Sequence, residues 1–170
     1  LNPIGIKTRV GPLASQAGAM ILAGGGHAVD AAIAANAAMG FLSPGMCGVG
    51  GDLFAIVYDA KSGKLHGLNA SGWAPQALSI ERIKAAGFTA MPQEGVHTVT
   101  VPGAVEGWQK LHERFGRTKL SLVLEPAIRY ASHGVPVSEW VANYWLATEA
   151  GLRQTSNAAR TSPPNDTTAS

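Results

Sequence analysis

Apolar residues recur at helical spacing near the start of the chain and predict two successive helices. Residues 13–22 have this spacing, and the three glycines that follow them supply the backbone conformations that end a helix. A second helix is predicted over 27–39, where alanine dominates and the small side chains allow a neighbouring element to pack closely. We therefore expect 27–39 to be the buried helix of the fold.

The pattern then changes to one that is typical of strands. Residues 43–51 contain too much glycine and proline for regular structure, whereas 52–58 is rich in the bulky and β-branched residues of a central strand. Residues 59–63 run from Asp to Gly as in a hairpin turn, and 64–69 returns as the antiparallel partner. The sequence thus predicts one β-hairpin directly after the two helices.

Most of the remaining chain is predicted to be helical. Further helices are expected at 79–86, 103–115, 120–132 and 137–150, and a third strand at 96–101. Residues 153–170 carry Ser, Thr, Asn and a pair of prolines but no large apolar residue, which is typical of a flexible or disrupted end. We therefore divide the chain into an ordered part, 1–152, and a tail, 153–170.

The charge pattern narrows the classes of partner. Charged residues make up 14% of the chain, and the formal charge of +2 comes from scattered Lys and Arg, so no nucleic-acid partner is expected. The longest apolar stretch, 28–42, is interrupted by Asp30 and Asn36 and falls short of the roughly 20 apolar residues that a membrane-spanning helix needs. No membrane span is predicted. The compartment is left open, because the chain begins at Leu1 and a leader peptide could have been removed.

No cofactor or metal site is predicted. In the glycine-rich segment, Leu53 takes the place of the third glycine of a dinucleotide-binding fingerprint, and a strand follows where that fingerprint needs a helix. Cys47 is the only cysteine, so neither a disulfide nor a cysteine-based zinc cluster can form within the chain. Five dispersed histidines are interpreted as structural residues: His27, His66, His97, His112 and His133.

The order of the short motifs is more informative than any single motif. The series runs LASQAG at 13–18, GGGHAVDAA at 24–32, SP at 43–44, GVGG at 48–51, YDAKSGK at 58–64, AP at 74–75 and VPGAVEGW at 101–108. In this order the chain resembles, from residue 13 to about residue 152, the N-terminal part of the large subunit of the gamma-glutamyltranspeptidases.

This resemblance implies an α+β, four-layer αββα N-terminal-nucleophile hydrolase fold, only partly contained in this chain. A precursor of this kind cleaves itself and exposes a threonine whose own α-amino group acts as the base. The acyl group passes from a gamma-glutamyl amide, typically glutathione, to that threonine and then to water or an amino acid. The threonine begins the small subunit and lies beyond this chain, so we predict no catalytic residue here and no activity of this segment alone. The expected partners are the rest of the large subunit, the small subunit of the same precursor and a small-molecule amide substrate.

One position departs from the family pattern and affects the expected substrate. Typical members carry an arginine four residues before the proline of the Ala74-Pro75 pair, and it binds the α-carboxylate of the gamma-glutamyl group; here that position is Ser71. A hydroxyl of short reach cannot replace a bidentate guanidinium. This difference favours the transpeptidase-like branch of the family, with the acyl donor left open.

We predict that Ser71 and Trp73 line one wall of the donor pocket. The alternative for these two residues is a loop held in place by packing of the Trp73 ring. For the whole protein, the alternative is a non-catalytic fragment or a diverged scaffold that keeps the fold without the chemistry.

Overall fold

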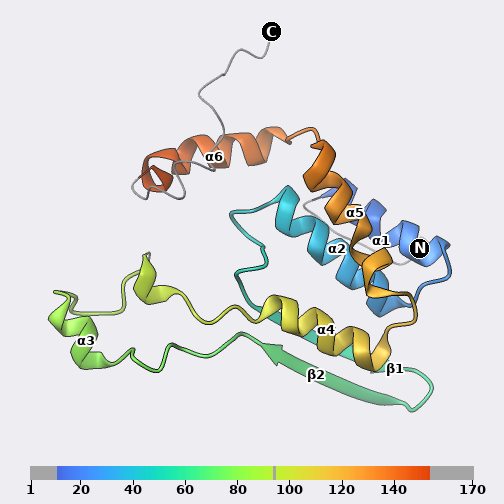
Figure 1. Ribbon diagram of the computed structural model, residues 1–170, viewed down its shortest axis with the longest axis horizontal. Helices are drawn as coiled ribbons and strands as arrows, with labels where there is room; N and C mark the ends of the chain where they lie inside the picture. The colour runs from blue at the N-terminus through green and yellow to red at the C-terminus, as the bar shows by residue number, and fades with distance from the viewer. Residues whose placement is uncertain (1–10, 94, 154–170) are drawn as a thin grey trace, which may run out of the picture. The chain divides into compact units, whose positions relative to one another are not determined.

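The computed structural model describes residues 11–93 and 95–153, which fall into two compact units divided between Gly134 and Val135. The described helices and strands, in chain order, are α1 (Pro12–Ala23), α2 (Ala28–Leu42), β1 (Leu53–Asp59), β2 (Lys64–Ala70), α3 (Ile80–Ala85), a 3-10 turn (Val96–Thr98), α4 (Ala104–Phe115), α5 (Leu120–His133) and α6 (Glu139–Leu152) (Figure 1). Helix α6 belongs to the second unit, and all the other elements belong to the first.

The first two helices begin and end through local hydrogen bonds. Gly25, two positions after the last residue of α1, has φ +88°, a left-handed conformation that glycine adopts without a steric penalty. His27 caps α2: its Nδ1 accepts from the N–H of Val29 at 3.4 Å, and its own N–H donates to Asp30 Oδ2 at 2.7 Å. These bonds satisfy backbone donors that the start of a helix would otherwise leave unpaired.

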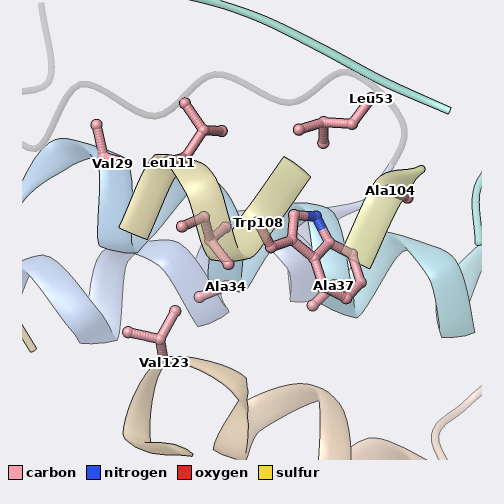
Figure 2. Packing of buried hydrophobic residues seen from close by; sticks show 9 residues of the cluster. Val29, Ala34, Ala37, Leu53, Ala104, Trp108, Leu111 and Val123 are labelled. Carbon is pink, nitrogen blue, oxygen red and sulfur yellow. The ribbon is translucent and has the colours of Figure 1, made fainter. Parts of the chain in front are cut away.

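Helix α2 is the buried helix that its alanine content predicts. It packs against α1, α4 and α5. Its small residues Ala34 and Ala37 share one buried cluster with Trp108 of α4 and Val123 of α5 (Figure 2). The buried indole of Trp108 donates from Nε1 to Asn36 Oδ1 at 2.7 Å, so its polar group has a partner. The alanine-rich surface therefore lets α4 and α5 approach α2 closely.

Strands β1 and β2 form the predicted antiparallel hairpin, in a register that runs from Leu53 opposite Ala70 to Asp59 opposite Lys64. Helix α4 covers one face of the hairpin (Figure 1). A Cβ atom at Gly107 would lie 2.5 Å from Leu53 Cδ2 and 3.0 Å from Ala70 Cβ. The glycine thus permits a close approach between helix and hairpin that a larger residue would prevent.

The opposite face of the hairpin carries large apolar side chains that the described residues leave exposed. These side chains are Phe54, Ile56, Tyr58 and Leu65. Sheet faces of this composition are normally covered. The exposed face is consistent with the prediction that this chain contains only part of a layered αββα fold.

The prediction of a third strand at 96–101 is wrong. Val96–Thr98 forms a 3-10 turn, and residues 99–101 have no regular structure. Gly95 has φ +96°, and its carbonyl accepts both the N–H and the hydroxyl of Thr98, at 3.1 and 2.8 Å. The β-branched residues indicated a strand, but a strand also needs a free neighbouring edge along its length. Here the hydrogen bonds within the Gly95–Thr98 turn replace pairing with another strand. The described segment makes one bond of the kind a strand would make, from the Val101 N–H to the Trp73 carbonyl.

The helix predictions are confirmed within two residues at each end, except that α2 ends at Leu42, three residues later than predicted. Ser79 and Ser138 accept backbone hydrogen bonds at the starts of α3 and α6. Arg153, the first residue of the predicted tail, pairs with Glu149 at 2.6 Å, and residues 154–170 lie outside the described residues. Within the described ranges, every helix is too short or too polar to cross a bilayer.

Candidate functional site

Three loops meet where the hairpin ends beside the start of α4 (Figure 1). We call them the glycine loop (43–52), the Ser71 loop (71–75) and the Thr100 segment (99–103). The Gly51 carbonyl accepts the N–H groups of Gly103 and Ala104, at 3.1 and 3.0 Å, which ties the glycine loop to the first turn of α4. The Val101 N–H donates to the Trp73 carbonyl at 2.9 Å. The Thr100 segment is therefore bonded to both of the other loops.

The backbone around Ser71 is fixed from both sides. Asn69 Oδ1 accepts the Ser71 N–H at 3.0 Å, an arrangement that turns the chain as β2 ends. The Thr100 hydroxyl lies 3.2 Å from the Ser71 carbonyl oxygen. Gly72 then has φ +75°, and a Cβ atom there would overlap the Val101 carbonyl oxygen. Only glycine fits this position without strain.

Trp73 is held by its backbone and not by its ring. Its side chain is 86% exposed, while its carbonyl accepts the Val101 N–H. Among the described residues, the Trp73 ring therefore does not pack in a way that would anchor the loop. Ser71 is half-buried two positions earlier. The structure thus brings both predicted site residues into one hydrogen-bonded turn, with the exposed indole of Trp73 projecting from it.

A shallow polar depression of about 380 Å³ lies over the glycine loop. Its lining includes Asn36 of α2, Cys47 and Asp52. Asp52 Oδ1 is also 3.3 Å from the Thr100 hydroxyl. The depression and the Ser71 loop therefore share Thr100 as a neighbour.

The three loops carry little charge. Asp52 is the one Asp, Glu, Lys or Arg residue within these loops. These loops supply no cation that could bind a carboxylate in place of the family arginine. The described residues also contain no group of three or more His, Cys, Asp or Glu side chains arranged to hold a metal ion.

Sequence reasoning missed Asp52 and Thr100 as parts of this site. It interpreted Thr100 as an ordinary strand residue, because the alternation with valine is typical of a strand. Its contact with the Ser71 loop spans 29 positions in the sequence, and no local pattern signals it. Asp52 had one usable signal, since it is a charged residue placed directly after a glycine run and before a predicted strand.

The sequence model of the gamma-glutamyltranspeptidases matches residues 14–169. This chain belongs to the gamma-glutamyltranspeptidase family. The resemblance inferred from the ordered motifs is thus confirmed. The glutathione hydrolase-like YwrD proenzyme of Bacillus subtilis is 40% identical over 127 residues, which cover 74% of this chain and 24% of that protein. The chain spans about a quarter of the length of this curated relative.

Solved structures of the family have the same fold. A cephalosporin acylase from Bacillus halodurans is 47% identical, with a TM-score of 0.79, over 84% of this chain and 26% of that one. The Helicobacter pylori gamma-glutamyltranspeptidase is 28% identical, with a TM-score of 0.81, over 90% of this chain and 46% of that one. The predicted fold class is therefore confirmed: this chain is an α+β part of the N-terminal-nucleophile hydrolase fold of the gamma-glutamyltranspeptidases.

Proposed function

We propose that the complete protein carrying this segment is an acyltransferase or amidohydrolase of the gamma-glutamyltranspeptidase type. This segment forms scaffold and one wall of the acyl-donor pocket. The observation that carries the proposal is the hydrogen-bonded turn containing Ser71 and Trp73, linked through the Thr100 segment to the glycine loop in a chain of this family. The names of two relatives, a glutathione hydrolase-like proenzyme and a cephalosporin acylase, support acyl transfer from an amide.

The reaction we propose is nucleophilic catalysis in two steps. An N-terminal threonine, exposed by cleavage of the precursor, attacks the amide carbonyl of the donor while its α-amino group takes the hydroxyl proton. The amine leaves with that proton, and an acyl-enzyme ester remains. Water or an amino acid then attacks the ester and releases the acyl group. The rest of the large subunit and the small subunit of the same precursor supply the groups that this segment does not contain.

Ser71 is expected to affect which amides bind as acyl donors. In this family position an arginine would form a charge-assisted, bidentate contact with the α-carboxylate of a gamma-glutamyl group. Ser71 offers one short hydroxyl, and the nearest loops offer no cation. We therefore propose donors whose binding does not depend on an α-carboxylate. The identity of 47% to a protein named as a cephalosporin acylase supports this direction.

Trp73 supplies the apolar part of the same wall. Its ring projects from a backbone that hydrogen bonds hold in place, so contact with a donor requires little reordering of the loop. A large aromatic surface of this kind suits the hydrocarbon part of an acyl group.

A comparison of two donors tests the proposal. The complete protein is assayed with gamma-glutamyl anilide and with 4-aminobutyryl anilide, which differ only in the α-carboxylate substituent. We expect release of aniline from at least one of the two, with no strong preference for the gamma-glutamyl compound, and mass spectrometry should find two subunits after self-cleavage. A protein that remains uncleaved and hydrolyses neither donor would instead support the diverged scaffold.

A further inference from the structure

The hydroxyl of Thr100 lies between the Ser71 carbonyl oxygen, at 3.2 Å, and Asp52 Oδ1, at 3.3 Å. It carries one hydrogen and faces two acceptors at similar distances, so the two loops share this hydrogen in a three-centre arrangement. In the described part of the chain, the other hydrogen bonds that join these loops are between backbone groups. Thr100 thus provides the side-chain link among the three loops of the site.

We propose that Thr100 is a positioning residue for the donor-pocket wall. The inference rests on the function proposed above and adds a residue that acts through Ser71 without contacting the donor. The Thr100 hydroxyl selects the orientation of the peptide between Ser71 and Gly72, and it holds Asp52 beside that peptide.

The conformation of Gly72 explains why this peptide needs a side-chain partner. A peptide plane can rotate when ψ of the preceding residue and φ of the following residue change together, and glycine allows many values of φ. Asn69 fixes the N–H of Ser71, and Val101 fixes the carbonyl of Trp73, but the Ser71 carbonyl lies between these two bonds. The Thr100 hydroxyl is its hydrogen-bond donor. Without that hydroxyl the peptide is free to turn, and the side chains of the wall change direction with it.

The chain offers a matched control. Thr98 lies two positions earlier and also uses its hydroxyl in a hydrogen bond, at 2.8 Å, but to the Gly95 carbonyl within its own turn. Valine has nearly the shape of threonine and lacks the hydroxyl. Thr100→Val therefore removes a bond between loops, whereas Thr98→Val removes a bond within one loop.

The experiment uses the complete, processed protein and its better anilide donor. Thr100→Val should raise KM by about two- to tenfold, the loss expected for one hydrogen bond, with kcat changed by less than about twofold. Thr100→Ser should restore KM, because serine supplies the same hydroxyl. Thr98→Val should leave both constants at the wild-type level. Equal KM values for Thr100→Val and Thr98→Val would overturn the proposal.

A second measurement is independent of turnover. Hydrogen–deuterium exchange in peptides covering 69–75 should be faster in Thr100→Val than in wild type, and unchanged in Thr98→Val and Thr100→Ser. If the wild-type protein hydrolyses neither donor, the proposed function fails, and this exchange still decides the role of Thr100. Faster exchange confined to that segment upholds it, and unchanged exchange overturns it.

Discussion

The buried carboxylate of Asp30, on α2, accepts the backbone N–H of Arg117, which lies 87 positions later between α4 and α5. The two distances, to Oδ1 and Oδ2, are 3.2 and 3.1 Å. The same carboxylate accepts from the N–H groups of Thr118, at 3.2 Å, and His27, at 2.7 Å. Asp30 is 0% exposed, so these backbone donors take the place of water. One side chain thus joins the start of α2 to the α4–α5 connection.

This arrangement predicts a large loss of stability for Asp30→Ala. The substitution removes a buried acceptor shared by three backbone N–H groups, and we expect the free energy of unfolding to fall by about 2–4 kcal/mol. Asp59→Ala, in the exposed hairpin turn, is the control and should cost less than about 1 kcal/mol. Chemical denaturation of the two variants beside wild type measures both effects. Equal losses for the two variants would show that the buried carboxylate has no special role.

Gly107 allows a test of the packing between α4 and the hairpin. Gly107→Val places a branched side chain where a single Cβ would already lie 2.5 Å from Leu53 Cδ2. We expect α4 to shift away from the hairpin at a cost of about 1–3 kcal/mol. Gly151→Val in α6 is the matched control, since a Cβ there has no described atom within 4 Å. Thermal unfolding of both variants should show a lowered midpoint for Gly107→Val and little change for Gly151→Val.

The sequence predicts these elements well where local chemistry determines them. The glycines after residue 23 ended α1, and the turn from Asp59 to Gly63 closed the hairpin. The error at 96–101 arose because β-branched residues show suitability for a strand but not the presence of a partner edge. Asp30 was recognised from sequence only as an interruption of an apolar stretch. Its role was hidden because most of its donors lie almost ninety positions away.

The sequence likewise predicted some features of the candidate site and not others. The departure of Ser71 from the family pattern was visible in one motif, and the structure then placed Ser71 and Trp73 in one turn. The contacts of Thr100 with Asp52 and the Ser71 loop could not be predicted, because they depend on how three separate loops meet.

Gly72 connects the geometry of the turn to donor binding. Gly72→Ala forces a side chain into φ +75° and also into the Val101 carbonyl oxygen. Gly63→Ala, at φ +68°, has the same backbone strain but open space around its Cβ, and it should cost about 1–2 kcal/mol. We expect Gly72→Ala to be less stable than Gly63→Ala and to raise KM for the anilide donor, which Gly63→Ala should not. Wild-type KM in a folded Gly72→Ala protein would show that the turn does not border the donor.

The strongest test of the donor pocket is Ser71→Arg in the complete protein. If Ser71 occupies the carboxylate-binding position of the family, arginine restores a charge-assisted, bidentate contact worth roughly 1.5–3 kcal/mol where water is excluded. The value of kcat/KM for a gamma-glutamyl donor should then rise by roughly ten- to hundredfold. This result requires that the Trp73 ring leave room for the longer side chain. The 4-aminobutyryl amides, which lack the α-carboxylate, should gain nothing.

Two comparisons make this result specific. Ser71→Gln supplies a longer polar side chain without the charge, so it should improve neither donor appreciably. Both donors are measured on wild type and on the two variants under the same conditions. An equal improvement of both donors by Ser71→Arg would indicate a general effect on the loop. A strong preference of the wild-type protein for gamma-glutamyl over 4-aminobutyryl amides would mean that another cation already binds the α-carboxylate, and Ser71 would then not be the position that determines the donor.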